Sequence, residues 1–247
     1  MLDSKCIGEM ARFLDYNSSV GGAIPKILHV DQRDTINSLG VLINYTGIAY
    51  PNLLGQKDPG QIEPFESACG GIFMLRREVY EAVGGFDEEL FVYHEDHDLS
   101  WRIRLAGWKL AVTTKAIMYH HYHFNKGVRK FYSSEKNRLY LLLKNMEVKT
   151  LALIFPALIL VEFSQWFHAM FNGWFLLKIK SYFEILNLLP TILAKRSKLK
   201  SLRKTPDGEI THIYQGTLAV SGIKNPLLTY VLSPILNIYW KLIRNLI

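Results

Sequence analysis

The residues best suited to chemistry form the run HEDHD at positions 94 to 98, where three carboxylates and two histidines are consecutive. Like charges this close together repel one another, so their grouping calls for a physical reason. The run directly follows the apolar residues FVY at positions 91 to 93, which places it beside a buried edge. It therefore either opens a solvated helix or supplies a base or a metal ligand.

A helix start explains part of this pattern without any function. Acidic residues in a first helical turn are stabilised by the helix dipole by about 0.3–1 kcal/mol each. Glu95, Asp96 and Asp98 lie where a helix from about Glu95 to Ala106 is predicted. Asp98 is also placed to pair with Arg102, one turn later.

A metal site is the alternative, because three more histidines lie downstream. Histidine and carboxylate side chains together form mixed metal sites in proteins. The two histidines of HEDH are three positions apart, not the four of the zinc-protease motif, so that class of enzyme is excluded. A metal-dependent hydrolase would instead use His94, Asp96, His97 and His120, and the downstream histidines are His120, His121 and His123.

The bulk composition is that of one domain of ordinary size plus an extension. The chain has 247 residues, 49% of them hydrophobic, and a net charge of +7. A basic chain suits nucleic acid, anionic lipid or a phosphorylated substrate, so the position of the charges must decide among them. Two cysteines, Cys6 and Cys69, are too few for a disulfide framework and fit a reducing compartment. The first residues lack the apolar segment of a signal peptide.

The pattern of the first 150 residues predicts an α/β fold. Short apolar runs alternate with Gly, Pro and Asp, and helical spacing recurs between them. Two glycines at 84 and 85 are expected to end the helix that begins near Arg77. The other predicted helices are 5–16, 95–106 and 134–146, and the predicted strands are 25–30, 69–76, 109–114 and 116–119.

The remaining residues predict a helical extension that contacts a membrane. Residues 151–177 are apolar and long enough to cross a bilayer, although Pro156 and several polar residues interrupt them. Eight Lys or Arg residues and one acid follow between positions 178 and 204. Apolar stretches beside a basic run fit the cytoplasmic side of a membrane. Spanning, lying on the surface, and packing as a buried hairpin all remain open for residues 151–177.

Several motifs in order resemble the second half of a family 2 glycosyltransferase catalytic domain of the rhamnosyltransferase-like kind. They are the helix and GGFDE turn from Arg77 to Phe91, the EDHDLSWR segment from Glu95 to Arg102, and Gly107. A strand ending in histidines (AIMYHH) and the helix EKNRLYLLLKN at 135–145 follow. The resemblance covers roughly residues 5 to 200. It implies a partial GT-A (Rossmann-like) domain at 1–149 and a helical, hydrophobic and basic, membrane-associated extension at 150–247.

The resemblance implies an inverting glycosyltransferase that moves a sugar from a nucleotide-sugar to a glycan or lipid-linked acceptor, as in cell-surface polysaccharide biosynthesis. Asp96 matches the family's catalytic base, and a base must be ionised to work. Glu95 and Asp98 would shape the acceptor side, and Arg102 would orient Asp98. Trp101 is placed either to stack on the acceptor or to pack in the core.

The donor side follows from the same resemblance. Gly70 and Gly71 would let the donor approach the backbone closely. His120 matches the histidine that helps to hold a divalent metal, Mg or Mn, on the diphosphate, with His121 and His123 as substitutes. The resemblance also implies that a D-x-D motif completes this metal site; in the family it lies ahead of these segments, and we expect it to be absent from this chain.

The family's nucleotide-binding half also has no counterpart here. We therefore expect a fragment or a split subunit, inactive as this chain alone, that works with a separate chain carrying that half. A non-catalytic membrane-associated accessory subunit remains an alternative, as does the hydrolase. The expected partners are a nucleotide-sugar, the acceptor and the membrane surface, with no nucleic acid. The expected location is the cytoplasmic face of the cell membrane.

Overall fold

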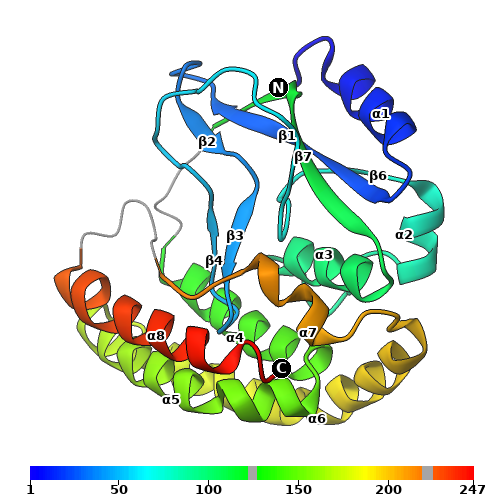
Figure 1. The fold of residues 1–247 in the computed structure, drawn as a ribbon. Helices are drawn as coiled ribbons and strands as arrows, with labels where there is room; N and C mark the ends of the chain where they lie inside the picture. The colour runs from blue at the N-terminus through cyan, green and yellow to red at the C-terminus, as the bar shows by residue number, and fades with distance from the viewer. Residues whose placement is uncertain (122–126, 219–224) are drawn as a thin grey trace.

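A computed structural model describes residues 1–121, 127–218 and 225–247. Figure 1 shows a sheet with helices on both faces in one half of the molecule and a group of long helices in the other half. The mixed α/β architecture predicted from the sequence is confirmed. The sheet half positions the acidic run, and the helical half contains most of the basic extension.

The main sheet has five strands, with β1 parallel to β7 along almost its whole length and the other strands antiparallel to these two. β2 and β6 pair with different parts of β1, and β5 pairs with β7. The two short strands predicted at 109–114 and 116–119 are one continuous strand, because both follow β1 in parallel across a register shift. The strands are β1 Val20–His29, β2 Ile36–Ser38, β5 Phe65–Glu66, β6 Met74–Leu75 and β7 Lys109–His120.

β1 begins at Val20, earlier than the predicted start at Pro25, and the glycines explain why. A Cβ on Gly22 would lie 2.4 Å from a Leu75 methyl group and 2.7 Å from one of Leu110. Only glycine lets these neighbouring elements approach so closely. The predicted strand at 69–76 is shortened to β6, Met74–Leu75, and the residues before it run as irregular chain.

Three helices cover the two faces of this sheet. Alternate residues of the central strands face opposite sides, as a strand requires. Ala23 and Ala111 pack with α1, whereas Ile24 and Val112 pack in a second cluster with Leu99 and other residues of α2 and α3. The helices are α1 Cys6–Tyr16, α2 Arg77–Val83 and α3 Glu95–Leu105.

The predicted cap of α2 is confirmed. Gly84 adopts the left-handed conformation, with φ 78°, and its N–H donates to the carbonyl groups of Tyr80 and Glu81. The left-handed conformation carries no steric penalty for glycine. The turn that follows leads the chain toward the start of α3.

Helices α4 to α8 and a small sheet form the other half of the described chain. The apolar run predicted at 151–177 is divided between α5 and α6 at Gly173, whose φ of 72° ends the first helix. α4 begins at Val128, earlier than the predicted Ser134. The helices are α4 Val128–Asn145, α5 Val148–Phe171, α6 Phe175–Leu202, α7 Asp207–Ile210 and α8 Ser233–Ile243, and the small sheet contains β3 Val41–Asn44, β4 Ala49–Pro51 and β8 Tyr214–Gln215.

The C-terminal elements share a core with residues near position 45. The Trp240 ring of α8 stacks on Tyr45 with ring centroids 4.6 Å apart, and the Tyr45 hydroxyl donates to the Leu236 carbonyl at 3.0 Å. β8 also pairs in parallel with β3. The predicted boundary between two domains, at residues 149 and 150, stays a prediction. Residues on the two sides of this boundary pack together.

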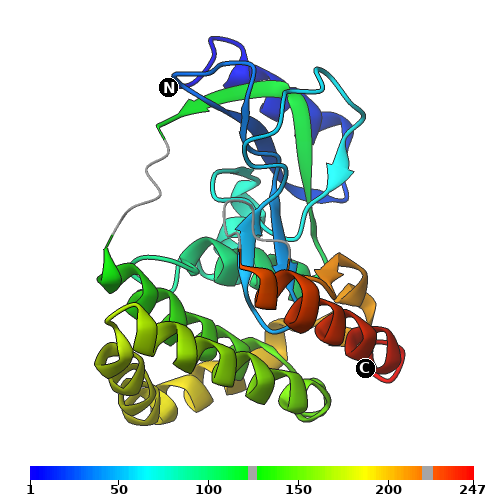
Figure 2. The ribbon, with the colours of Figure 1, turned by 90° about the vertical axis from the view of Figure 1, so that its left-hand side faces the viewer.

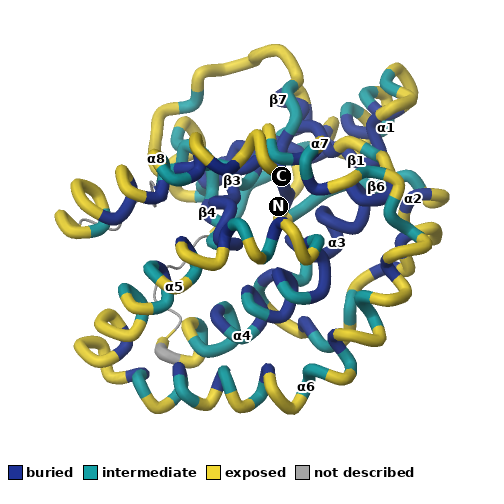
Figure 3. The backbone as a smooth tube through the Cα atoms, turned by 60° about the horizontal axis from the view of Figure 1, so that its bottom comes forward, coloured by how far each residue is buried: buried dark blue, intermediate teal, exposed yellow. Residues whose placement is uncertain are grey.

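The helical half exposes many apolar side chains. Among the described residues, α5 is the one helix long and apolar enough to cross a bilayer, as judged by length and composition. Figures 2 and 3 show α4, α5 and α6 side by side at one end of the molecule, with much of α5 exposed. The exposed apolar residues of α5 include Phe155, Phe163, Phe167, Met170 and Phe171.

Candidate functional site

The acidic run lies at the start of α3, after a turn with unusual backbone geometry. Tyr93 and His94 both adopt the left-handed conformation, with φ of 65° and 67°. Residues other than glycine rarely adopt it, and such strain is concentrated at functional sites. Asn137 of α4 fixes the turn, because its side-chain amide donates to the carbonyls of Val92 and Tyr93 at 2.9 and 2.7 Å.

Asp96 faces the chain at Gly71. A Cβ built on Gly71 would lie 3.5 Å from Asp96 Oδ2, and Gly71 itself is exposed. The other carboxylate oxygen, Oδ1, accepts a hydrogen bond of 2.8 Å from the N–H of His97. The Asp96 side chain is thus oriented by its own helix and partly exposed beside a residue without a side chain.

The surroundings of Asp96 raise its pKa to about 6. Burial is the main cause and the charge of Glu95 is the second, while hydrogen bonds from the start of the helix oppose both. A helix start favours the ionised form of a carboxyl group, but desolvation outweighs that effect at Asp96. A carboxyl group with a pKa near 6 is still mostly ionised at neutral pH and is a stronger base than an ordinary aspartate.

Glu95 lies beside Asp96 and is half-buried. Burial raises the pKa of its carboxyl group as well. Its Oε2 atom is buried and accepts no hydrogen bond from the described residues. The two carboxylates therefore oppose each other's ionisation, which favours one charge over two at this position.

Asp98 does not reach the acceptor side as expected, because its side chain is completely buried, with 0% exposed. It accepts a hydrogen bond from Arg102 Nε at 2.8 Å and lies 2.7 Å from Lys144 Nζ. Asn145 donates at 2.8 Å to Oδ1, the oxygen that also faces Lys144. Arg102 orients Asp98, as predicted, but is itself buried against the Val83 carbonyl, so the pair serves the packing of α2, α3 and α4.

Trp101 lies in the core and is only 3% exposed. Its ring packs against His97 and Tyr214, with centroids 5.5 and 5.8 Å apart. Of the two roles expected for it, the structure places Trp101 in the packing role, which leaves no face for an acceptor to stack on.

His94 and His97, which the residue pattern indicated as possible metal ligands, form a buried pair. Their Nδ1 atoms are 3.2 Å apart, and His94 Nε2 lies 3.2 Å from the Ser134 hydroxyl of α4. Burial lowers the pKa of both rings, that of His94 to about 4, so both are neutral at physiological pH. They connect the start of α3 to α4. The left-handed turn at Tyr93 and His94 depends on tertiary contacts, so no local residue pattern predicts it.

The two glycines play different parts. A Cβ on Gly70 would lie 2.6 Å from the Ile24 side chain, so Gly70 is required by packing against β1. Gly71 meets only the Asp96 carboxylate. Of the two, Gly71 alone is open to a ligand.

His120 lies at the end of β7, where it pairs in register with His29 and its Nδ1 is 3.3 Å from Asn37 Oδ1. His121 lies 3.7 Å from Asp31, and His123 lies outside the described residues. Within residues 1–121, 127–218 and 225–247, no three His, Cys, Asp or Glu side chains are grouped closely enough to hold a metal ion. The described residues therefore do not fit a complete metal site, either for a diphosphate or for the hydrolase alternative.

A second network, which the sequence analysis did not assign, anchors the GGFDE turn. Asp87 of this turn binds Lys144 and Lys195, each at 2.5 Å. Burial raises the pKa of the Asp87 carboxyl group, but the lysines lower it by more, so the pKa lies below its usual value. Tyr140 donates to the same carboxylate at 3.1 Å. The sequence signal was an aspartate two positions after the pair of glycines, but the sequence does not indicate its partners on α4 and α6.

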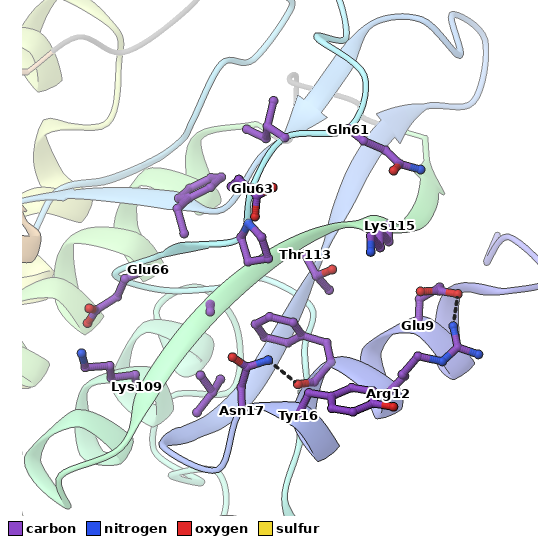
Figure 4. A pocket seen from close by; sticks show the side chains of 16 residues that line it. Glu9, Arg12, Tyr16, Asn17, Gln61, Glu63, Glu66, Lys109, Thr113 and Lys115 are labelled. Atoms are coloured by element: carbon purple, nitrogen blue, oxygen red, sulfur yellow. Dashed lines mark hydrogen bonds and ion pairs between the residues drawn. The ribbon is translucent and has the colours of Figure 1, made fainter.

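A cavity outside the acidic run lies in the sheet half of the described chain. It has a volume of about 810 Å³ and lies between α1, the chain before β5 and one face of β7 (Figure 4). Charges of both signs line it, including Arg12, Glu63, Lys109 and Lys115. No residue of the acidic run contributes to it.

Comparisons with known proteins find a family match over the segment that contains the acidic run, and bacterial relatives that match part of the chain. Residues 56–124 match a family described as the N-terminal domain of galactosyltransferase. The chain is 38% identical over 65 residues to N-acetylglucosaminyl-diphospho-decaprenol L-rhamnosyltransferase of Mycobacterium tuberculosis, which is 25% of this chain and 21% of that protein. It is 29% identical over 96 residues to the O-antigen biosynthesis protein RfbC of Myxococcus xanthus, covering 35% of this chain and 8% of that protein.

A solved structure also matches, that of GalNAc-T7 with UDP, GalNAc and Mn²⁺. The TM-score is 0.47 with 13% identity, covering 63% of this chain and 32% of that chain. The matches thus span about a fifth or less of the two bacterial relatives. The resemblance predicted from the motifs is confirmed in part of the chain: residues 56–124 are similar to a galactosyltransferase family, and parts of the chain are similar to a bacterial rhamnosyltransferase and to an O-antigen biosynthesis protein.

Proposed function

We propose that the chain carries the acceptor side of an inverting glycosyltransferase, with Asp96 as the catalytic base. The observation that supports this most directly is the Asp96 carboxylate beside the exposed Gly71. It is the member of the acidic run that is both oriented and partly exposed. Glu95 assists by raising the affinity of Asp96 for a proton.

The proposed reaction is a single displacement. Asp96 takes the proton from an acceptor hydroxyl group as that oxygen attacks the anomeric carbon of the donor sugar. The bond from this carbon to the nucleoside diphosphate breaks with its electron pair on the leaving oxygen. Attack from the opposite side inverts the configuration, and a positioned base contributes about 10²–10⁴-fold to such a step.

The proposed donor is a nucleotide-sugar and the proposed acceptor is a glycan or a lipid-linked glycan. The printed names of the rhamnosyltransferase and O-antigen relatives support these classes. We further propose that the protein works at the cytoplasmic face of the membrane. The exposed apolar residues of α5 and the basic residues of α6 support this location.

The test measures sugar transfer by the chain joined to the nucleotide-binding half of a GT-A rhamnosyltransferase. UDP-, GDP- and dTDP-sugars serve as donors, and membrane extracts provide acceptors. Asp96→Asn is expected to reduce transfer by about 10²–10⁴-fold. Asp15→Asn, on an exposed position of α1, is the matched control and should leave transfer unchanged. Transfer unaffected by Asp96→Asn would overturn the assignment.

A further inference from the structure

An apolar groove lies between α4, α5 and α6, away from the acidic run. It has a volume of about 390 Å³. Residues of all three helices line it, including three leucines of α4. Figure 3 shows the backbones of these helices side by side. The residues from α4 and α6 that line it are Leu139, Leu142, Leu143, Tyr182 and Ile185.

The groove is open along α5. Phe155, Ile159 and Phe163 line it and are themselves substantially exposed. Apolar surface gains about 25 cal/mol per Å² when it leaves water, so an open groove of this kind favours a hydrocarbon occupant. Exposed apolar residues continue from the groove over the outer side of α5, at Phe167 and Met170.

One part of the groove is polar. Trp166 Nε1 donates to the Tyr182 hydroxyl at 2.7 Å, and this hydroxyl donates to Glu162. Glu162 also pairs with Arg138 of α4 and lies 2.8 Å from Lys178 of α6. Arg138 and Lys178 are buried, so the apolar lining ends at a fixed cluster of charges.

This charged cluster leads to the start of α3. Arg138 binds Glu135 at 3.0 Å, and the neighbouring Ser134 lies 3.2 Å from His94 Nε2. His94 is the first residue of the acidic run. The groove is thus connected to the proposed catalytic residues through a continuous set of contacts on α4.

A cation lies beside the same turn. Lys130 Nζ is 6.0 Å from the centre of the Tyr93 ring, and Tyr93 directly precedes His94. Arg129, next to it, is exposed. An anionic head group would meet these charges where the acidic run begins, while an attached hydrocarbon chain follows the groove.

From this arrangement we infer that the groove binds the hydrocarbon chain of a lipid-linked acceptor whose head group is a phosphate ester. The inference rests on the proposed function and adds the chemical class of the acceptor's lipid part. The connection from groove to α3, with the cations at its end, favours an acceptor chain over membrane lipid in general. Membrane lipid would need only the outer apolar face of α5.

The experiment uses the full chain in mixed micelles with farnesyl phosphate that carries a diazirine near the end of its hydrocarbon chain. After irradiation, mass spectrometry locates the labelled residues. Labels are expected on the lining residues of α4, α5 and α6. An excess of unlabelled farnesyl phosphate should suppress them, whereas phosphatidylglycerol at the same concentration should not.

Two matched variants test the position. Ile159→Trp fills the groove at a partly exposed position and should weaken labelling by about tenfold. Ile238→Trp makes the same change on the exposed side of α8, outside the groove, and should leave labelling unchanged. Labels on α8 as strong as those in the groove, equal competition by phosphatidylglycerol, or unchanged labelling of Ile159→Trp would overturn the inference.

The outcome is separable from that of the proposed function, because labelling needs no sugar transfer. Asp96→Asn should be labelled like the unmodified chain. If transfer survives Asp96→Asn while labelling follows the groove, the catalytic assignment fails and the groove still binds the chain. If labelling fails while transfer depends on Asp96, the inference alone fails.

Discussion

Asp96 and Gly71 face each other at the start of α3, with room for a single added carbon between them. A Cβ on Gly71 would lie 3.5 Å from Asp96 Oδ2, which is ordinary van der Waals contact. Its neighbour Gly70 is tightly packed, at 2.6 Å from Ile24. Two adjacent glycines thus have different physical requirements.

This difference predicts that the same substitution affects stability much more at Gly70 than at Gly71. Gly70→Ala should lower the free energy of unfolding by about 1–3 kcal/mol, because the new methyl group overlaps Ile24. Gly71→Ala should change it by less than about 0.5 kcal/mol. Urea denaturation of the two variants measures both values. Equal destabilisation by the two changes would show that the chain at Gly71 is as tightly packed as at Gly70.

The raised pKa of Asp96 predicts the pH dependence of transfer. A base acts in its ionised form, so the rate should fall as the pH decreases through about 6. Rates measured between pH 5 and 8 with a saturating donor give the midpoint. Glu95→Gln removes a neighbouring charge that raises this pKa and should move the midpoint to lower pH. A midpoint that stays the same in Glu95→Gln would contradict the coupling between the two carboxylates.

The same shift predicts that Asp96→Asn stabilises the protein at neutral pH. The carboxyl group binds its proton more tightly in the folded state, since its pKa rises from 3.8 to about 6. Stability is therefore lost as the pH rises from about 4 through about 6. Asp96→Asn should recover about 1–3 kcal/mol at pH 7.5 and much less at pH 4. Thermal unfolding at the two pH values checks this, and a gain of equal size at both would rule out proton linkage.

The buried pair of Asp98 and Arg102 should matter far more for stability than an exposed pair of the same spacing. Asp98→Ala leaves the buried charges of Arg102 and Lys144 without their partner and should cost about 3–5 kcal/mol. Glu81→Ala breaks the exposed pair with Arg77 and should cost less than about 0.5 kcal/mol. Chemical denaturation of both variants gives the comparison. Similar losses for the two would mean that the buried cluster adds nothing to the stability of this region.

The exposed face of α5 predicts binding to lipid vesicles that high salt does not abolish. Screening weakens attraction between charges but leaves the burial of apolar side chains intact. Changing Phe167 and Phe171 to Ser should reduce co-sedimentation with anionic vesicles by about tenfold or more. Changing Phe86 and Phe91 to Ser alters equally exposed residues on the sheet half and should have no effect. Complete release by salt alone would contradict an apolar attachment.

The sequence by itself determined the α/β class, the cap at Gly84 and the helix that carries the acidic run. These features depend on local patterns, namely hydrophobic period, glycine conformation and acids at a helix start. It also determined the family resemblance through several motifs in order. Local patterns could not assign a role to each carboxylate. Asp96 and Asp98 have the same chemistry and are two positions apart.

Only the tertiary structure separated these two aspartates, because burial and partners depend on distant residues. Lys144 and Asn145, nearly fifty positions later in the chain, enclose Asp98, while Gly71 leaves Asp96 accessible. Desolvation raises the pKa of Asp96, and the hydrogen bonds of the helix start lower it. The balance between the two depends on burial, which residue spacing does not reveal. The same long-range contacts placed Trp101 in the core and kept His120 away from any group of metal ligands among the described residues. Side-chain type and spacing indicate what chemistry is available, and packing decides which groups can perform it.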